Sequence, residues 1–101
     1  MRGRAGRGIL SAMRAPLPGS QVVHTGLADL AQGEASVAAL LVSIGGPRLR
    51  RLGLPVSNPI PTAEHRLYAV LRAEDPATAH SRYNALVRLL VSFERAAECA
   101  T

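Results

Sequence analysis

The last quarter of the chain, residues 76–97, carries the apolar pattern that most constrains the fold. It follows the dipeptide Asp75-Pro76, and because a residue before proline avoids the helical conformation, any preceding helix should end there. Asp75 is predicted to cap the next helix, with Pro76 at its first position. Apolar residues then recur at alternating spacings of four and three, as in a helix with one buried face; they are Ala79, Tyr83, Leu86, Leu90, Phe93 and Ala97. The sequence therefore predicts a helix about 33 Å long.

Shorter segments before this helix also show helical spacing. Their apolar residues repeat at i, i+3 and i+4, or flank a single helical turn; the segments are residues 25–32, 34–44, 47–52 and 63–74. Thr25 and Thr62 are predicted N-caps. Gly33 should end the first helix, and Gly45-Gly46-Pro47 should break or kink the second.

The expected fold class is all-α, a small irregular helical bundle of four to five helices with a long C-terminal helix. The chain has 101 residues, which fits one domain, and its apolar residues are mostly Ala, Leu and Val, of which Ala and Leu favour helices. The β-branched residues of the segment 34–44 could suggest a strand, but its alanines and its helical spacing favour a helix. Residues 1–23 are glycine-rich and lack helical periodicity, so they are predicted to form a flexible basic N-terminal tail. Residues 24–101 are predicted to form a single helical domain.

The positive charge is concentrated in the tail. The whole chain carries a net charge of +5, which on its own suggests a nucleic-acid partner. Residues 1–14 contain four arginines and no acidic residue, whereas from Ala15 onward eight arginines stand against seven acidic residues. The body is therefore close to neutral. The apolar part of the tail, Ile9 to Met13, is too short for a secretory signal, and a natural start at Met13 is an alternative interpretation of the basic segment.

Several classes of site find no support in the sequence. The chain has no lysine, so it has no lysine-type phosphate loop. Cys99 is the only cysteine, and His24, His65 and His80 do not have the spacing of a zinc site. We therefore expect no cofactor, no metal and no enzymatic activity. No apolar run is long enough to span a membrane, so we expect a cytoplasmic protein without a membrane partner.

The stretch GGPRLRRLG, Gly45 to Gly53, contains three arginines within four residues. Arg48, Arg50 and Arg51 are candidates for contact with nucleic acid or with an acidic partner, because guanidinium groups bind phosphate and carboxylate in a bidentate manner. The alternative is that they lie on the solvated face of a short helix, or that they meet acids of the chain itself such as Glu64, Glu94 or Glu98. Glu94 and Glu98 are themselves expected to be solvated.

Residues 27–45 also allow a helix-turn-helix interpretation, which competes with a core role for the second helix. A recognition helix presents polar side chains to base edges. The outward residues here would be Ser36, Ala39 and Ser43, which offer little, so a core helix is the favoured interpretation.

The function predicted from the sequence is that of a non-enzymatic helical interaction module, self-associating or accessory to a larger protein. A partner helix ending at Glu74 would cover only the first half of the long helix. The second half needs another cover, either the earlier helices or a second copy of the chain. The predicted protein interface is the face formed by Leu86, Leu90, Phe93 and Ala97. The alternative function is a nucleic-acid-binding regulator that uses the arginine cluster and the basic N-terminal arm.

Overall fold

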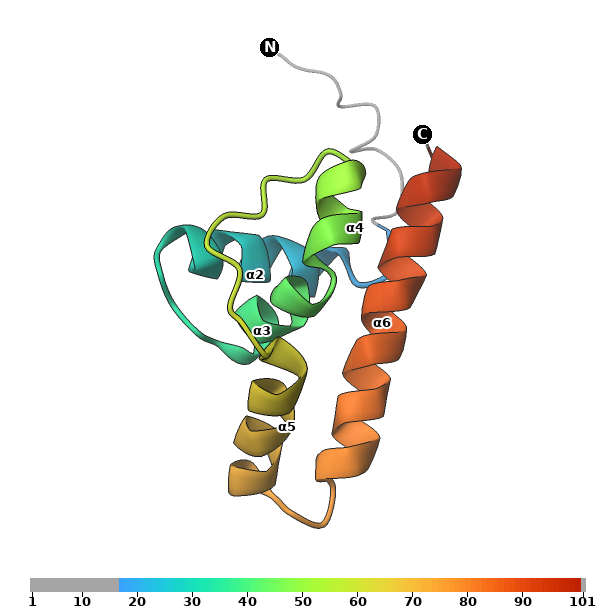
Figure 1. The fold of residues 1–101 in the computed structure, drawn as a ribbon. Coiled ribbons are helices and arrows are strands. Elements are labelled where there is room, and N and C mark those ends of the chain that lie inside the picture. The colour runs from blue at the N-terminus through green and yellow to red at the C-terminus, as the bar shows by residue number, and fades with distance from the viewer. Residues whose placement is uncertain (1–16, 101) are drawn as a thin grey trace.

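The computed structural model describes residues 17–100, and helices joined by turns and loops are the only regular secondary structure within that range (Figure 1). The predicted all-α bundle with a long C-terminal helix is confirmed. The helices are α2 (Ser20–Ala31), α3 (Val37–Ile44), α4 (Gly46–Arg51), α5 (Ala63–Glu74) and α6 (Ala79–Ala100). Helix α6 runs along the whole bundle, with α5 antiparallel to its first half and α4 beside its second half (Figure 1).

Helix α3 forms the centre of the core. Its residues Ala38 to Val42 are all buried, because an almost purely apolar helix is stable only when other elements cover it on every side. Ala39, expected to face outward, is completely buried. The Ser43 hydroxyl donates to the Ala39 carbonyl and accepts from the backbone N–H of Ile60 at 2.9 Å, so its polar group is satisfied. These contacts agree with the core interpretation of this helix.

Helices α2 and α3 approach each other closely at Gly26. A Cβ atom added at Gly26 would overlap the backbone carbonyl of Ala38 and the side chain of Val42. Glycine is unfavourable inside a helix, so its presence in the middle of α2 reflects this contact rather than local propensity. The close approach allows Val23, Leu27 and Leu30 of α2 to join the core.

One predicted helix start and one predicted helix cap are wrong. Helix α2 begins at Ser20, after Gly19, rather than at a Thr25 cap, so residues 20–23 belong to the first helix instead of the predicted tail. The part of that tail at residues 1–16 lies outside the described residues. Thr62 does precede α5, but its backbone is left-handed and its hydroxyl donates to the Pro61 carbonyl, so it makes no side-chain cap.

The break at Asp75-Pro76 is confirmed, with a shift of the following helix. Helix α5 ends at Glu74, and the chain makes a turn before α6 begins at Ala79 instead of Pro76. The Asp75 carboxylate accepts from the Ala77 N–H at 3.1 Å and from the Thr78 hydroxyl at 2.9 Å. Asp75 thus caps the turn rather than the helix itself, and α6 continues to Ala100, past the predicted end.

Candidate functional site

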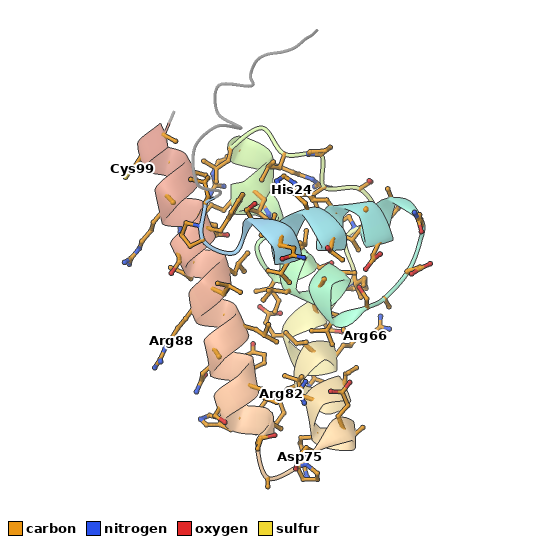
Figure 2. The ribbon with its side chains drawn as sticks, turned by 180° about the vertical axis from the view of Figure 1, so that it is seen from behind. His24, Arg66, Asp75, Arg82, Arg88 and Cys99 are labelled. Carbon is orange, nitrogen blue, oxygen red and sulfur yellow. The ribbon has the colours of Figure 1, made fainter. Side chains whose placement is uncertain are left out.

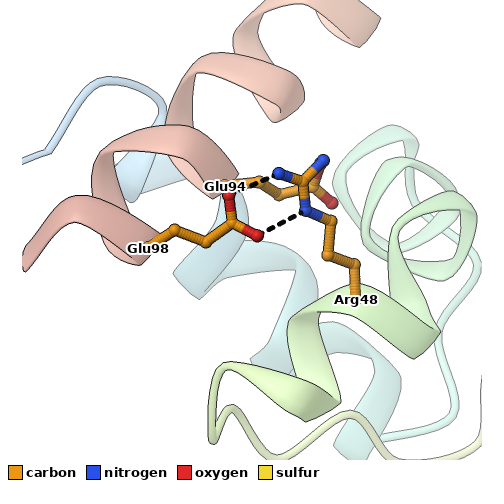
Figure 3. Close-up of polar contacts among 3 residues, drawn as sticks. All are labelled: Arg48, Glu94 and Glu98. Atoms are coloured by element: carbon orange, nitrogen blue, oxygen red, sulfur yellow. Dashed lines mark hydrogen bonds and ion pairs between the residues drawn. The ribbon is translucent and has the colours of Figure 1, made fainter. Parts of the chain in front are cut away.

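Arg48 of α4 joins two carboxylates of α6 (Figure 3). Its Nε and one terminal nitrogen donate to the two carboxylate oxygens of Glu98 at 3.1 and 2.6 Å. The other terminal nitrogen donates to Glu94 at 3.4 Å. The short helix predicted for residues 47–52 forms as α4, with Leu49 buried beneath it, and this orients Arg48 toward α6. Arg48 therefore makes a structural connection between two helices that are distant in the sequence.

Glu94 is buried, contrary to the expectation of a solvated side chain. Its side chain is 6% exposed, whereas that of Glu98 is 47% exposed. Space for the carboxylate comes from Gly45, where an added Cβ would lie only 2.7 Å from Oε2 of Glu94. Burial raises the pKa of Glu94, the positive charge of Arg48 opposes this rise, and the negative charge of Glu98 adds to it. Gly45 thus makes room for a buried acid.

The pKa values of Glu98 and Arg48 move in opposite directions. The hydrogen bond from Arg48 lowers the pKa of Glu98, and the charges of Arg48, Arg51 and Arg95 lower it further. The hydrogen bond to Glu98 is also the main cause of the raised pKa of Arg48. Each partner therefore favours the charged form of the other, which is the behaviour of an ion pair.

The other two arginines of the cluster have different surroundings. Arg50 donates from Nε and from a terminal nitrogen to the Val56 carbonyl, at 3.1 and 2.9 Å, and so holds the loop that follows α4. Arg51 is exposed. Two of the three candidate nucleic-acid contacts therefore have their guanidinium groups engaged within the chain.

The four residues of the predicted protein interface lie on the inner face of α6. Leu90 and Phe93 are only 3% and 4% exposed, and Leu86 and Ala97 are half-buried against the same core. Leu90 contacts the α3–α4 junction, because a Cβ at Gly45 would lie 3.1 Å from its methyl groups, and Phe93 meets the ring of His24 edge-on. Of the two covers that the sequence left open for the second half of α6, the structure shows the earlier helices.

The surface next to this face carries an exposed leucine and a hollow. Leu89 is 37% exposed and is the only large exposed hydrophobic side chain among residues 17–100. It forms one wall of an open hollow of about 550 Å³, where the start of α2 meets α6. The other walls are Leu17, Gly19, Ser20, Gln21 and Val22. This site does not follow from the sequence pattern, because the predicted start of the first helix at Thr25 excludes residues 20–22 from that helix.

A second hollow, of about 280 Å³, shares Leu17 and Ser20 with the first. It lies between the start of α2, the end of α4 and the last turns of α6. Its other polar wall residue is His24; its apolar walls are Leu17, Leu52, Leu54, Phe93, Ala97 and Ala100. Figure 2 shows His24 on α2 and Cys99 near the end of α6.

The histidines do not assemble into a metal centre within the described part of the chain. His80 and Asn84, which lie four residues apart on α6, form a hydrogen bond of 3.2 Å. Tyr68 packs edge-on against His80 and Tyr83, with ring centres 6.4 and 5.6 Å apart, and burial raises the pKa of Tyr83. Between residues 17 and 100 no group of three His, Cys, Asp or Glu side chains could hold a metal ion. Cys99 is free and exposed.

Among the described helices, none is long and apolar enough to cross a membrane. Comparisons with protein-family models, with curated proteins and with solved structures give no match to this chain.

Proposed function

We propose that this chain is a non-enzymatic helical interaction module of the cytoplasm that associates with a second copy of itself. The observation that carries the proposal is the exposed Leu89 on the wall of the larger hollow. A surface that offers both an apolar side chain and a recess is complementary to itself, and two-fold symmetric dimers use one such surface on each subunit. The predicted interface thus moves from the buried face of α6 to the neighbouring one.

The residues around Leu89 support close helix packing. Ala85, Ser92 and Ala96 lie four residues before, three after and seven after Leu89, and therefore share its face of α6. Their small side chains allow a second helix to approach with little steric obstruction. Arg88 is also exposed and projects away from the bundle (Figure 2), which leaves it at the rim of this face.

Sedimentation velocity over a concentration series tests the proposal. The expected result is a monomer–dimer equilibrium that the Leu89→Arg variant shifts to monomer, because the new charge would be buried without a partner in the dimer. Ala69→Arg, at an exposed position of α5, is the matched control and should leave the equilibrium unchanged. A wild-type protein that stays monomeric at every concentration, or equal effects of the two variants, would contradict self-association.

The nucleic-acid alternative receives less support from the geometry. Arg48 and Arg50 already bind Glu94, Glu98 and the Val56 carbonyl, so phosphate contact would require breaking these interactions. Phosphate contacts also make binding fall steeply with salt. A gel-shift series on duplex DNA and RNA distinguishes the two functions. Salt-sensitive binding by the wild type that is lost in an Arg50→Ala, Arg51→Ala double variant would favour the nucleic-acid-binding regulator. If the wild type binds neither DNA nor RNA, this use of the arginine cluster is excluded.

A further inference from the structure

The smaller hollow is an apolar recess whose walls come from three separate parts of the chain. Leu17, Leu52 and Leu54 are half-buried around it, while Phe93 forms part of its floor within the core. Its walls meet where the described chain begins, because Leu17 is both the first described residue and a wall residue. We propose that the chain's own segment Ile9 to Met13 binds in this hollow.

The composition of the first sixteen residues points to this segment. They consist mostly of arginine, glycine and alanine, and after Met1 their only large apolar side chains are Ile9, Leu10 and Met13. Arginine and glycine around them give no other apolar surface on which these three side chains could be removed from water. A hollow with six apolar wall residues supplies such a surface.

The connection to Leu17 makes the contact accessible within one molecule. The residues of the segment lie four to eight positions before Leu17, and an extended chain spans at most about 14–28 Å over that number of positions. A segment tethered this closely has an effective concentration in the millimolar range, far above that of a free second copy in dilute solution. Even a weak contact would therefore be populated within the same chain.

Paramagnetic relaxation enhancement in the full 101-residue chain tests the proposal. Cys99 is the only cysteine and is exposed, so a nitroxide can be attached to it without substitution. The amide signals of Ile9, Leu10 and Met13 should be broadened more than those of Arg2 and Arg4, which lie further from the hollow along the chain. Equal broadening of both groups would overturn the proposal.

Two matched variants distinguish docking from mere proximity to Leu17. Leu10→Asp should abolish the excess broadening, because it places a charge in the apolar hollow, whereas Ser11→Asp adds the same charge beside it and should retain the effect. Loss of the excess broadening in both variants, or in neither of them, would contradict the docking of this segment in the hollow. In a mixture of nitroxide-labelled unenriched chains and unlabelled ¹⁵N-enriched chains, equally strong broadening would place the segment on a second copy and also overturn the proposal.

Discussion

Arg48 of α4 contacts the buried carboxylate of Glu94 of α6 at 3.4 Å, across 46 positions of sequence. The same guanidinium binds Glu98 through two further hydrogen bonds (Figure 3). A cluster of arginines that suggests nucleic-acid binding in the sequence therefore contributes to holding a short helix against the long one. Because Glu94 is almost fully buried, Arg48 supplies positive charge where little water can reach the carboxylate.

Replacing Arg48 should destabilise the fold more than replacing its neighbour Arg51. In Arg48→Ala, Glu94 keeps its buried position but loses the guanidinium that binds it, and Glu98 loses a bidentate partner. Arg51→Ala removes the same side chain from an exposed position of the same helix. Urea denaturation followed by circular dichroism should give a lower midpoint for Arg48→Ala and one near wild type for Arg51→Ala. The opposite order would show that the ion pairs have no structural role.

The two glutamates should have opposite effects on the pH dependence of stability. Burial raises the pKa of Glu94 in the folded state. The contribution of this side chain to the stability of the fold is therefore fully present below its unfolded pKa and is lost as the pH rises through the folded pKa. Removing its charge by Glu94→Gln should therefore stabilise the protein near pH 7 relative to wild type. The gain should disappear near pH 4, where the wild-type side chain is itself increasingly protonated.

Glu98→Gln provides the matched comparison. The pKa of the wild-type Glu98 carboxyl is lowered in the folded state, chiefly by the hydrogen bond from Arg48. The contribution of Glu98 to stability is therefore present above its unfolded pKa and is lost as the pH falls through the folded pKa. The variant should be less stable than wild type near pH 7, and the difference should shrink in acid. Urea midpoints measured between pH 3 and pH 8 check both signs. Parallel curves for the two variants would contradict the assigned environments.

Gly26→Ala should destabilise the protein although alanine is the better helix former. The added methyl group overlaps the Ala38 carbonyl and the Val42 side chain, and the backbones of α2 and α3 must separate to admit it. Overpacking of this kind costs about 1–3 kcal/mol. Gly33→Ala is not a suitable control because Gly33 has a positive φ angle. Ala28→Gly, at an exposed position of α2, serves as the control and should cost only about 1 kcal/mol through the lower helix propensity of glycine. Thermal unfolding of Gly26→Ala and Ala28→Gly compares the two effects.

Two adjacent leucines of α6 should respond very differently to truncation. Leu90 is 3% exposed and contacts the α3–α4 junction, so Leu90→Ala leaves a cavity and should cost about 2–5 kcal/mol. Leu89 is 37% exposed, and Leu89→Ala should cost less than about 1 kcal/mol in the monomer. Chemical denaturation at low protein concentration measures both. A large effect at Leu89 with a small one at Leu90 would mean that the buried face of α6 is assigned incorrectly.

Local sequence signals predict the helical fold and the boundaries of α5. The α5 ends, the break at Asp75-Pro76 and the buried face of α6 follow from local rules, because proline, glycine and apolar spacing act within a few residues. The start of α2 does not follow from these local signals. The helix begins before Thr25, and its residue Val23 packs in the core against other helices.

The contacts of Glu94, Arg48 and Leu89, in contrast, depend on packing between elements that are distant in the sequence. Glu94 has the sequence context of a solvated acid, and it is buried because α4 and the small Gly45 approach it from a distant part of the chain. The same packing of helices buries Leu90 and Phe93 and leaves Leu89 exposed. It also brings Arg48 within ion-pair distance of Glu94. Helical periodicity specifies which residues share a face, but the partner that covers that face depends on long-range packing, which local spacing does not encode.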